Sequence, residues 1–431
     1  NIRMFRPMES YQKYGGVLTF ARSVGYAVVK KPEGYTTAKV DQIIQEYEKK
    51  SANEQQSTAK QYPNIITVVN ETFADIKVLG DFKTNEDYMP YFHSLKKNCV
   101  TGYTYASIVG GQTANTEFEL LTGNTLGFLS AGTTAFQLYI HGQMPSLVSN
   151  LKAEGYSGNK AMHPFNPYNY NRPAVYKDFG FTDFIDKFDF PKNVKRVREY
   201  ISDEANVDRI ISEYEKNRKK TDQPFYMYNM TIQNHSPYDK DAANFKQPIK
   251  IESSKYDAEA NRYLNLIKYS DNSLKQLTSY FEKCKEPTII LFLGDHQPRL
   301  TDEFMNKITN GQYQTWSSEQ MMKRYQVPFV IWANYDIKEQ HIEKTSMNYI
   351  QSILTKTAGV KMTGYQRFLN EVRKEVPTIT SQGYWGKNGK FYQINDKGSP
   401  YYGIIQKYRM IQYNMMFDKK NRRDPFFEVS K

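Results

Sequence analysis

Short runs of apolar residues, each as long as one buried strand, constrain the fold of this chain more than any other feature. The run at residues 64–69 has the sequence Asn-Ile-Ile-Thr-Val-Val, and comparable runs lie at 225–230, 288–293 and 327–332. Continuous β-branched and apolar runs of this kind are typical of parallel strands that are buried on both faces.

Stretches with helical spacing of apolar residues separate these runs. We expect helices at residues 37–56, 144–154, 194–216 and 256–283. In the first of them, Val40, Ile43 and Tyr47 recur at helical intervals. Strands that alternate with helices predict an α/β fold, in which helices flank a mostly parallel sheet. Because ligands bind beyond the carboxyl ends of such strands, we expect reactive side chains directly after each apolar run.

Length and composition limit the class of protein. A chain of 431 residues can form one large α/β domain with appendages. No apolar stretch approaches the ~20 residues of a membrane helix, and no signal-peptide pattern opens the chain. The two cysteines, Cys99 and Cys284, exclude a disulfide scaffold.

The domain organisation follows from changes in composition. Residues 51–61 are polar and free of large aliphatic side chains, which is typical of a linker. We therefore expect a stem or linker with one helix at 1–60 and a catalytic domain at 61–365. The Tyr-, Lys- and Asn-rich residues 366–431 are expected to form a smaller C-terminal α+β subdomain.

The net charge of +12 indicates an anionic partner, although a generally basic solvated surface explains it equally well. The basic residues are spread along the chain, without zinc-finger spacing or an RNA-binding aromatic signature. We therefore expect a membrane surface of acidic lipids or an anionic polymer as the partner, and no nucleic acid.

Two apolar runs lead into candidate metal ligands. Glu71 follows the run at 64–69, and Asp295 and His296 follow Leu-Phe-Leu-Gly at 291–294. Carboxylate oxygens together with one imidazole can converge on a divalent cation. Alternatively, Glu71 is a carboxylate at a helix N-terminus, and Asp295 is a helix cap beside a surface His296.

Two further segments offer a nucleophile and an acid or base. Gly110 and Gly111 precede a predicted helix that starts near Thr113, whose hydroxyl would meet backbone N–H groups at the positive end of the helix dipole. Such a hydroxyl suits attack on an anionic phosphorus centre, although Thr113 could equally be an N-cap. His235, after the run at 225–230, could orient a phosphate oxygen, act as acid or base, or be an ordinary loop histidine.

The order of these motifs over about residues 63–335 resembles the lipoteichoic acid synthase-like, phosphoglycerol transferase branch of the sulfatase/alkaline phosphatase superfamily. The matching pieces are Asn-Glu-Thr-Phe-Ala-Asp at 70–75, Gly-Gly-Gln-Thr-Ala-Asn-Thr-Glu-Phe at 110–118, Asn-His-Ser-Pro-Tyr at 234–238 and Gly-Asp-His at 294–296. Neither cysteine lies in the Cys/Ser-x-Pro-x-Arg motif of arylsulfatases, and the Asp-x-Asp-Ser motif of alkaline phosphatases is absent.

The resemblance implies roles for eight residues. One Mn²⁺ or Mg²⁺ would be held by Glu71, Thr113, Asp295 and His296, and Thr113 would be the nucleophile. The phosphate of a phosphoglycerol group would be bound by His163, Arg172 and His235. Tyr170 would contact the glycerol, although the family often has Trp at its position.

The resemblance also implies an activity, which is transfer of glycerophosphate from phosphatidylglycerol, an anionic glycerophospholipid, through a threonine-linked intermediate. The acceptor would be a glycerol phosphate polymer such as a lipoteichoic acid chain, a glycolipid or a wall polysaccharide. We expect the chain to belong to a longer multi-pass membrane protein and to lie on the extracellular face of a Gram-positive cell membrane. The alternatives are a phosphodiesterase or phosphatase that uses water as acceptor, and an inactive envelope-binding module.

Overall fold

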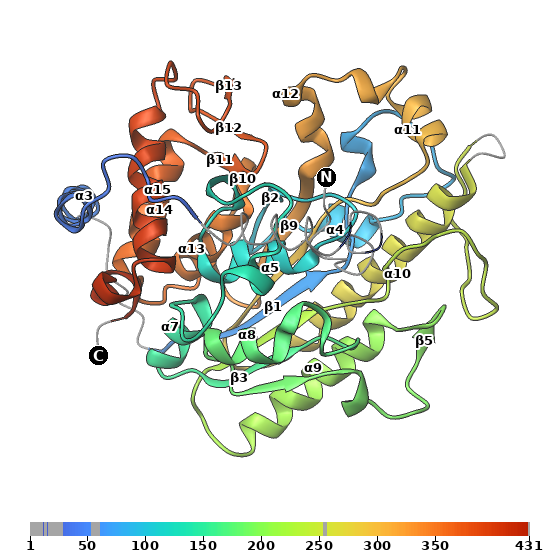
Figure 1. Cartoon of the computed structure of the whole chain (residues 1–431). Coiled ribbons are helices and arrows are strands. Elements are labelled where there is room, and N and C mark those ends of the chain that lie inside the picture. Colours follow the sequence, from blue (N-terminus) through green and yellow to red (C-terminus); the bar gives the residue numbers. More distant parts are fainter. Residues whose placement is uncertain (1–11, 13–14, 16–28, 53–60, 253–256, 430–431) are drawn as a thin grey trace.

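An eight-stranded sheet forms the centre of the molecule (Figure 1). The computed structural model describes residues 12, 15, 29–52, 61–252 and 257–429. The strand order is β10-β2-β9-β8-β1-β7-β3-β4. The strands are β1 (Asn64–Asn70), β2 (Cys99–Tyr105), β3 (Ser157–Met162), β4 (Asp183–Ile185), β7 (Phe225–Met230), β8 (Thr288–Gly294), β9 (Gln326–Ala333) and β10 (Gln340–Ser346).

The sheet is mostly parallel, as the sequence predicts. β1 pairs in parallel with β7 and β8, and β3 pairs in parallel with β7 and β4. β9 is the exception, because it runs antiparallel to both β8 and β2. The four predicted apolar runs form β1, β7, β8 and β9, whereas the other four strands have more mixed sequences and were not predicted individually. Because β1, β7 and β8 are parallel neighbours, Glu71, the segment before His235, and Asp295 leave the sheet at one edge.

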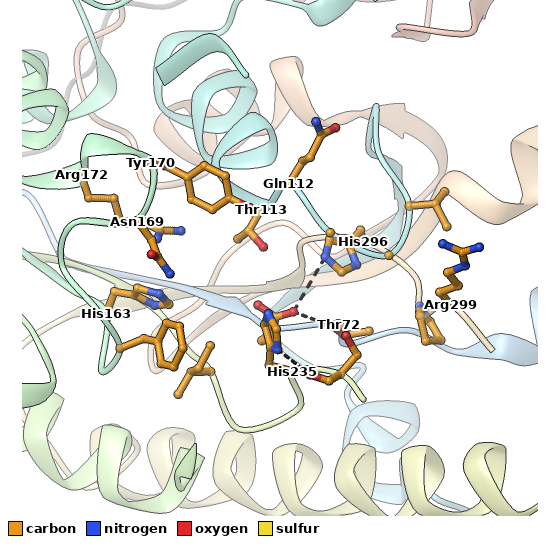
Figure 2. A pocket seen from close by; sticks show the side chains of 18 of the residues that line it. Thr72, Gln112, Thr113, His163, Asn169, Tyr170, Arg172, His235, His296 and Arg299 are labelled. Atoms are coloured by element: carbon orange, nitrogen blue, oxygen red, sulfur yellow. Dashed lines mark hydrogen bonds and ion pairs between the residues drawn. The ribbon is translucent and has the colours of Figure 1, made fainter. Parts of the chain in front are cut away.

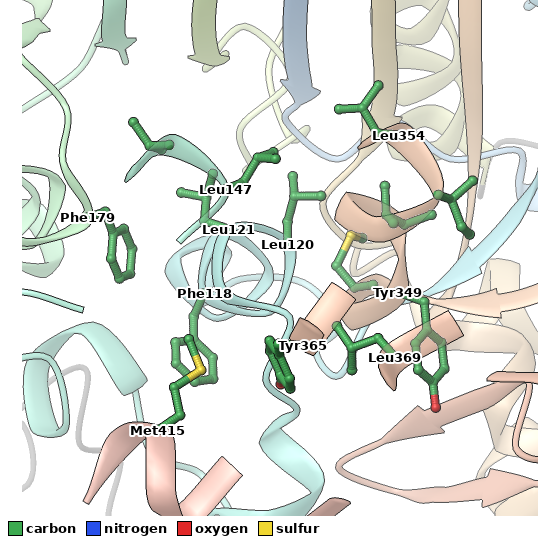
Figure 3. Close-up of a cluster of buried hydrophobic side chains, with 14 of the residues drawn as sticks. Phe118, Leu120, Leu121, Leu147, Phe179, Tyr349, Leu354, Tyr365, Leu369 and Met415 are labelled. Atoms are coloured by element: carbon green, nitrogen blue, oxygen red, sulfur yellow. The ribbon is translucent and has the colours of Figure 1, made fainter. Parts of the chain in front are cut away.

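Helices cover both faces of the sheet (Figure 1). On β1, Ile65 and Val69 face one apolar cluster, and Ile66 and Val68 face the other. The first cluster includes side chains of α5 (Thr113–Thr122), α7 (Leu147–Ala153), α8 (Arg172–Phe179) and α13 (Met347–Thr357), and Figure 3 shows part of it around α5. The second cluster includes side chains of α9 (Asp203–Arg218), α10 (Ala258–Phe281) and α11 (Asp302–Ile308). The remaining α-helices between β1 and the C-terminal part are α4 (Pro90–Ser94), α6 (Ala135–Leu138) and α12 (Ser318–Met321).

The C-terminal residues form the expected smaller α+β part. Its sheet consists of the antiparallel strands β11 (Thr378–Thr380), β12 (Gly383–Trp385) and β13 (Phe391–Tyr392), and its helices are α14 (Gly364–Glu375), α15 (Tyr402–Met416) and α16 (Asp424–Phe427). The N-terminal α3 (Thr37–Lys50) packs against it, since the rings of Tyr47 and Phe368 lie 4.6 Å apart. The boundary expected at residue 365 falls inside α14, and the division into domains stays a prediction.

The structure corrects the predicted helix at 194–216. α9 begins only at Asp203, and the residues before it form a two-stranded hairpin of β5 (Arg196–Val197) and β6 (Tyr200–Ile201). Arg198 lies in the hairpin turn at φ +55°, outside the helical region, and Ser202 caps α9 by accepting a hydrogen bond from the N–H of Ala205.

The structure also bears on the expected N-terminal helix and linker, and on whether any helix could span a membrane. The helix expected at 37–56 ends at Lys50, and residues 53–60 of the expected linker lie outside the described residues. Within the described ranges, every helix is too short or too polar to cross a bilayer.

Candidate active site

A pocket of about 580 Å³ opens at the carboxyl ends of the central strands (Figure 2). Seven of the eight expected site residues line it: Glu71, Thr113, His163, Tyr170, Arg172, His235 and His296. The eighth, Asp295, is fully buried next to His296. Side chains far apart in the sequence therefore meet where the strand ends converge.

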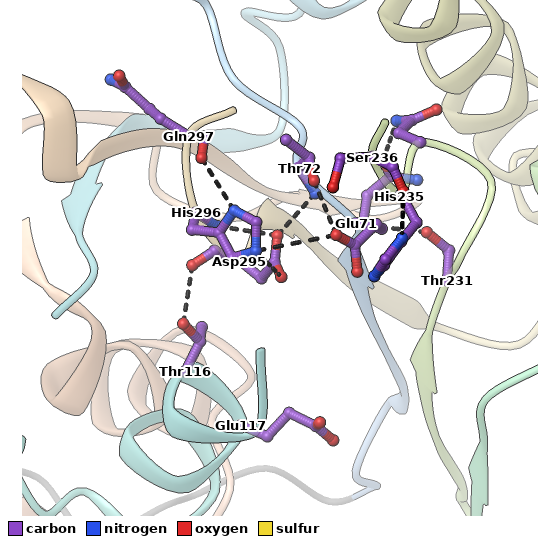
Figure 4. Close-up of polar contacts among 12 residues, drawn as sticks. Glu71, Thr72, Thr116, Glu117, Thr231, His235, Ser236, Asp295, His296 and Gln297 are labelled. Atoms are coloured by element: carbon purple, nitrogen blue, oxygen red, sulfur yellow. Dashed lines mark hydrogen bonds and ion pairs between the residues drawn. The ribbon is translucent and has the colours of Figure 1, made fainter. Parts of the chain in front are cut away.

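Glu71, Asp295 and His296 form a compact buried cluster (Figure 4). One candidate ligand atom from each residue lies within 4.8 Å of the others. His296 Nε2 is 3.2 Å from Asp295 Oδ2 and 3.8 Å from Glu71 Oε1. Carboxylate oxygens with one imidazole suit Mn²⁺ or Mg²⁺ better than a metal that prefers thiolates.

The chemistry of this cluster fits a divalent cation. His296 Nδ1 donates a hydrogen bond to the carbonyl of Gln297 at 3.0 Å, so in the neutral ring Nε2 turns a lone pair toward the carboxylates. Neither Nε2 nor Asp295 Oδ2 has a hydrogen-bond partner among the described residues, although both are buried. Burial and the charge of Asp295 raise the pKa of Glu71 to about 8. A bound cation would satisfy all three groups at once.

Backbone groups hold the cluster in place. Asp295 Oδ1 accepts hydrogen bonds from the N–H groups of Thr72 at 2.7 Å and His296 at 2.8 Å. The Thr72 hydroxyl donates to Glu71 Oε1 at 2.7 Å, and the Tyr263 hydroxyl donates to the Thr72 carbonyl at 2.8 Å. Thr72 adopts a left-handed conformation, with φ +54°. The sequence analysis missed Thr72 and Tyr263, because only the fold reveals these contacts.

Thr113 is the first residue of α5, and its side chain points into the pocket (Figure 2). Gly110, Gly111 and Gln112 all have positive φ, at 66°, 142° and 65°, and they turn the chain sharply into the helix. Gln112, not Thr113, occupies the N-cap position, so the alternative that Thr113 is an N-cap is wrong. The hydroxyl of Thr116, three residues further along α5, donates a hydrogen bond to the Asp295 carbonyl at 2.8 Å and so fixes α5 next to the cluster.

Arg172 is buried in a pair with Glu117, which the sequence analysis missed. Arg172 Nε and Nη2 donate to Glu117 Oε1 at 3.1 and 2.6 Å, and the hydroxyls of Tyr176 and Tyr228 donate to Glu117 Oε2. Glu117 therefore engages two of the three guanidinium nitrogens, and Arg172 also lines the pocket. Its contact with a phosphate stays a prediction. The guanidinium also lies 5.1 Å from the ring centroid of Tyr170.

His163 and His235 lie on the pocket wall with their Nδ1 atoms engaged. His163 Nδ1 donates to the Met230 carbonyl at 2.9 Å, and His235 Nδ1 donates to the Ser236 carbonyl at 2.7 Å. Burial lowers the pKa of both rings, that of His163 well below its ordinary range. A neutral ring in this tautomer presents Nε2 as an acceptor, which suits a substrate hydroxyl as well as a protonated phosphate oxygen. Their contacts with a phosphate stay a prediction.

Arg299 on the opposite wall was also missed by the sequence analysis. It follows the Asp295-His296 motif by three residues, is exposed, and lines the pocket. Its Cβ lies 2.9 Å from the position that a side chain on Gly110 would take, so Gly110 lets the two loops meet. The pocket therefore has cationic side chains on both walls, which suits an anionic substrate.

The candidate metal ligands at the strand ends and the hydroxyl at the start of α5 agree with the class of enzyme that the family comparison shows. The chain is a member of the sulfatase family, whose model matches residues 63–360. A protein of Rhizobium meliloti (strain 1021), named provisionally for cyclic β-1,2-glucan modification, is 30% identical over 433 residues, which cover 99% of this chain and 65% of the relative. The lipoteichoic acid synthase-like YvgJ of Bacillus subtilis (strain 168) is 27% identical over 237 residues, or 54% of this chain and 36% of the relative. The chain thus spans less than two thirds of the length of either relative.

Solved structures agree with the expected fold. The Streptococcus pyogenes phosphoglycerol transferase GacH, in complex with sn-glycerol-1-phosphate, superposes with a TM-score of 0.73 at 20% identity, covering 93% of this chain and all of that chain. The lipoteichoic acid synthase LtaP of Listeria monocytogenes gives a TM-score of 0.62 at 19% identity, covering 90% and 98%. The predicted resemblance is therefore confirmed at the level of family and fold.

Proposed function

We propose that this chain transfers a phosphoglycerol group from an anionic glycerophospholipid, such as phosphatidylglycerol, to a hydroxyl of a cell-envelope glycan. One observation carries the proposal: the Thr113 hydroxyl, at the start of α5, shares a pocket with the buried Glu71–Asp295–His296 cluster. A hydroxyl beside a cation site and helix N–H groups is suited to attack an anionic phosphorus centre.

Glu71, Asp295, His296 and Thr113 would hold one Mn²⁺ or Mg²⁺. When bound, such an ion lowers the pKa of a neighbouring hydroxyl and neutralises phosphoryl oxygens. In the first half-reaction the Thr113 hydroxyl loses its proton and Oγ1 forms a bond to phosphorus, while the bond from phosphorus to the diacylglycerol oxygen breaks. Diacylglycerol leaves with a proton, and the glycerophosphate remains on Thr113.

In the second half-reaction an acceptor hydroxyl attacks the same phosphorus and loses its proton, and Thr113 leaves with a proton. The Arg172 guanidinium, which lines the pocket and is fixed by its pair with Glu117, is proposed to face the phosphate oxygens. Tyr170, which lies against Arg172, is proposed to contact the glycerol. Neutral His163 and His235 present acceptors for the hydroxyl protons of the glycerol or the acceptor.

A glycan acceptor is favoured over a lipoteichoic acid chain. The Rhizobium relative, named for glucan modification, matches 99% of this chain, whereas the lipoteichoic acid synthase-like Bacillus relative matches 54%. We propose that the domain works at the outer surface of the cell membrane, where the lipid donor and envelope glycans are both present. The charge of +12 supports attraction to such an anionic surface.

The test is incubation of the chain with Mn²⁺ and phosphatidylglycerol labelled in its headgroup, with and without a glucan. We expect release of diacylglycerol and appearance of the label on the glucan, and loss of both with a chelator. Label that ends only in free glycerophosphate, even with glucan in excess, would identify a phosphodiesterase. Tight Mn²⁺ binding without any diacylglycerol release would identify an inactive binding module.

A further inference from the structure

Two large aromatic side chains stand in solvent beside the pocket. Tyr168 is 79% exposed and Phe188 is 73% exposed, and no other large hydrophobic side chain among the described residues is exposed to this extent. They lie on the segments that follow β3 and β4, two neighbouring strands of the sheet. The N–H of His163 bonds to the Ile185 carbonyl at 2.9 Å, so the two segments leave the sheet side by side.

Phe165 connects these two rings to the pocket. Phe165 and Tyr168 both line the pocket, and the N–H of Lys187 bonds to the Phe165 carbonyl at 3.4 Å. The Lys187 ammonium lies 6.0 Å from the Phe165 ring centroid and 4.9 Å from that of Phe188. Phe165 and Tyr168 thus lie on the pocket wall, and Lys187 lies near the rings of both Phe165 and Phe188. We name the side chains of Phe165, Tyr168 and Phe188 the aromatic ledge.

We propose that the aromatic ledge holds a sugar ring of the acceptor glucan, so that a hydroxyl of the neighbouring sugar reaches the pocket. This inference rests on the proposed function for the identity of the acceptor. The C–H faces of a hexose carry slight positive charge and pack on the negative faces of aromatic rings. Tyr168 lines the polar pocket and Phe188 lies on the neighbouring segment, and such highly exposed rings are suited to this contact.

Polar groups on the same segments supply partners for sugar hydroxyls. Asn166 Oδ1 accepts from the N–H of Tyr168 at 3.2 Å, and Asp186 Oδ1 accepts from the N–H of Phe188 at 2.7 Å. An amide and a carboxylate thus lie directly beside the two exposed rings. Aromatic rings with hydrogen-bonding groups on the same segments match a neutral carbohydrate, which has apolar faces and a polar edge.

Local charge argues against an anionic lipid surface as the occupant. Within five residues of Phe188 lie three carboxylates, Asp183, Asp186 and Asp189, and two ammonium groups, Lys187 and Lys192, so this stretch has a net negative charge. Carboxylates around a ring repel anionic headgroups, whereas surfaces that insert aromatic rings into such membranes are rich in Lys and Arg. A neutral glucan meets no such repulsion.

The test measures glucan binding by calorimetry in a Thr113→Ala background, which removes turnover. A cyclic β-1,2-glucan is titrated into this chain and into the same chain with Tyr168→Ala and Phe188→Ala. We expect binding to weaken about tenfold or more, which is what loss of about 1.4 kcal/mol of stacking would cause. Tyr168→Phe with Phe188→Tyr keeps both rings and should bind within about threefold of the parent. Equal binding by the alanine and parent chains would overturn the proposal.

A second experiment distinguishes a glucan from a lipid as the ligand of the aromatic ledge. It also tests the ledge independently of the proposed function. Phe188→Ala should raise the KM for glucan in the transfer assay, with little change in kcat and in sedimentation with phosphatidylglycerol vesicles. A Phe188→Ala chain that loses vesicle binding but keeps its KM for glucan would make the ledge a membrane contact. If the parent chain releases no diacylglycerol, the proposed function fails, and the calorimetry still decides whether the ledge binds glucan.

Discussion

Around Thr113, individual side chains sit in environments that cost stability in the absence of a ligand. Glu71 and Asp295 are both buried, and the pKa of Glu71 is raised to about 8 by burial and by its acidic neighbour. Two adjacent buried carboxylates, with Asp295 Oδ2 and His296 Nε2 lacking hydrogen-bond partners among the described residues, are unfavourable unless a cation joins them. Such local conflicts are expected at functional sites and rarely elsewhere.

Replacement of Thr113 tests the nucleophile. Thr113→Ala should abolish diacylglycerol release, because no other group would bond to phosphorus, whereas Thr113→Ser keeps a hydroxyl and should retain measurable activity. The stability cost should stay below about 1 kcal/mol, since Thr113 is not the N-cap of α5. Thermal unfolding checks the fold, and mass spectrometry of the stalled parent enzyme should find the glycerophosphate on the peptide that contains Thr113. Undiminished turnover by Thr113→Ala would refute the assignment.

The Arg172–Glu117 pair gives a second residue-scale prediction. Arg172→Lys should reduce turnover severely, because one ammonium cannot keep two bonds to Glu117 Oε1 and also face a phosphate. Glu117→Ala should lower the free energy of unfolding by about 3–5 kcal/mol, since it leaves a buried guanidinium unpaired.

Denaturant unfolding measures the stability, and metal content is followed in parallel. Lys50→Ala is the matched control, because its pair with Glu46 at 2.7 Å is exposed and should contribute under about 1 kcal/mol. We expect bound metal to be unchanged in Arg172→Lys. Near-normal turnover in that variant would remove Arg172 from the substrate site.

At the scale of secondary-structure elements, the metal cluster depends on how closely β8 approaches the segment after β1. Gly294 pairs with Asn70 at the ends of these strands, and a Cβ on Gly294 would lie 1.8 Å from the Phe73 carbonyl oxygen. A side chain here would push Asp295 and Glu71 apart. The glycine is thus required by packing between two elements.

Gly294→Ala should therefore weaken Mn²⁺ binding by at least about tenfold, since a backbone contact of this kind cannot be relieved by a rotamer change. Gly311→Ala is the control, because a Cβ on Gly311 would meet no atom within 4 Å. Titration calorimetry with Mn²⁺ compares the two variants. Equal affinity in Gly294→Ala and the parent would show that the cluster does not hold the ion.

The short helix α4 gives an element-scale prediction about pH. His93 in α4 forms ion pairs with Asp75 and Asp87, with Nε2 3.6 Å from Asp75 Oδ2 and Nδ1 2.8 Å from Asp87 Oδ2. Asp75 is the main cause that raises the pKa of His93 from 6.5 to about 9. Tyr88 and Tyr103 also donate to Asp75. Between pH 6.5 and 9 the folded chain keeps a proton that the unfolded chain has lost, so this contribution to stability is full below pH 6.5 and is lost as the pH rises through 9.

The His93→Gln variant should not show this loss of stability as the pH rises. We expect the difference in Tm between parent and variant to be largest at pH 6 and to vanish at about pH 10. Thermal unfolding at several pH values measures it, with His141→Gln, at an exposed histidine, as the control. A difference in Tm that does not depend on pH would contradict the assignment.

At the scale of the whole molecule, segments far apart in the chain share one core with α5, the helix that begins at Thr113. Val40 and Ile43 of α3, Phe118 and Leu121 of α5, and Ile405 of α15 belong to the same apolar cluster. Because α5 belongs to this core, a cation that binds only the folded chain should also stabilise the core.

Metal binding should stabilise the entire chain. At a Mn²⁺ concentration of about one hundred times Kd, we expect about 2.7 kcal/mol of added stability and a higher Tm, which a chelator reverses. Asp295→Asn should abolish this rise, and Asp241→Asn, at an exposed carboxylate paired with Arg262, should leave it unchanged. A Tm that ignores Mn²⁺ in the parent would contradict the cation site.

The sequence by itself determined the α/β class, the central strands and the candidate site residues. Continuous apolar runs can be buried only inside a covered sheet, and parallel strands bring the residues that follow them to one edge. This is why Glu71 and Asp295 could be placed together before their contacts were known. Helix boundaries were less certain, as the hairpin before α9 shows, because turn residues such as Arg198 override local spacing.

Only the tertiary structure decided which long-range partners each side chain has. Glu117 meets Arg172, and Thr72 meets Asp295, across 55 and 223 residues of sequence. The same holds for the aromatic ledge, because Tyr168 and Phe188 become neighbours of the pocket only through the pairing of β3 with β4. Sequence spacing reports contacts within one element, whereas burial, ion pairing and exposure depend on how distant elements pack.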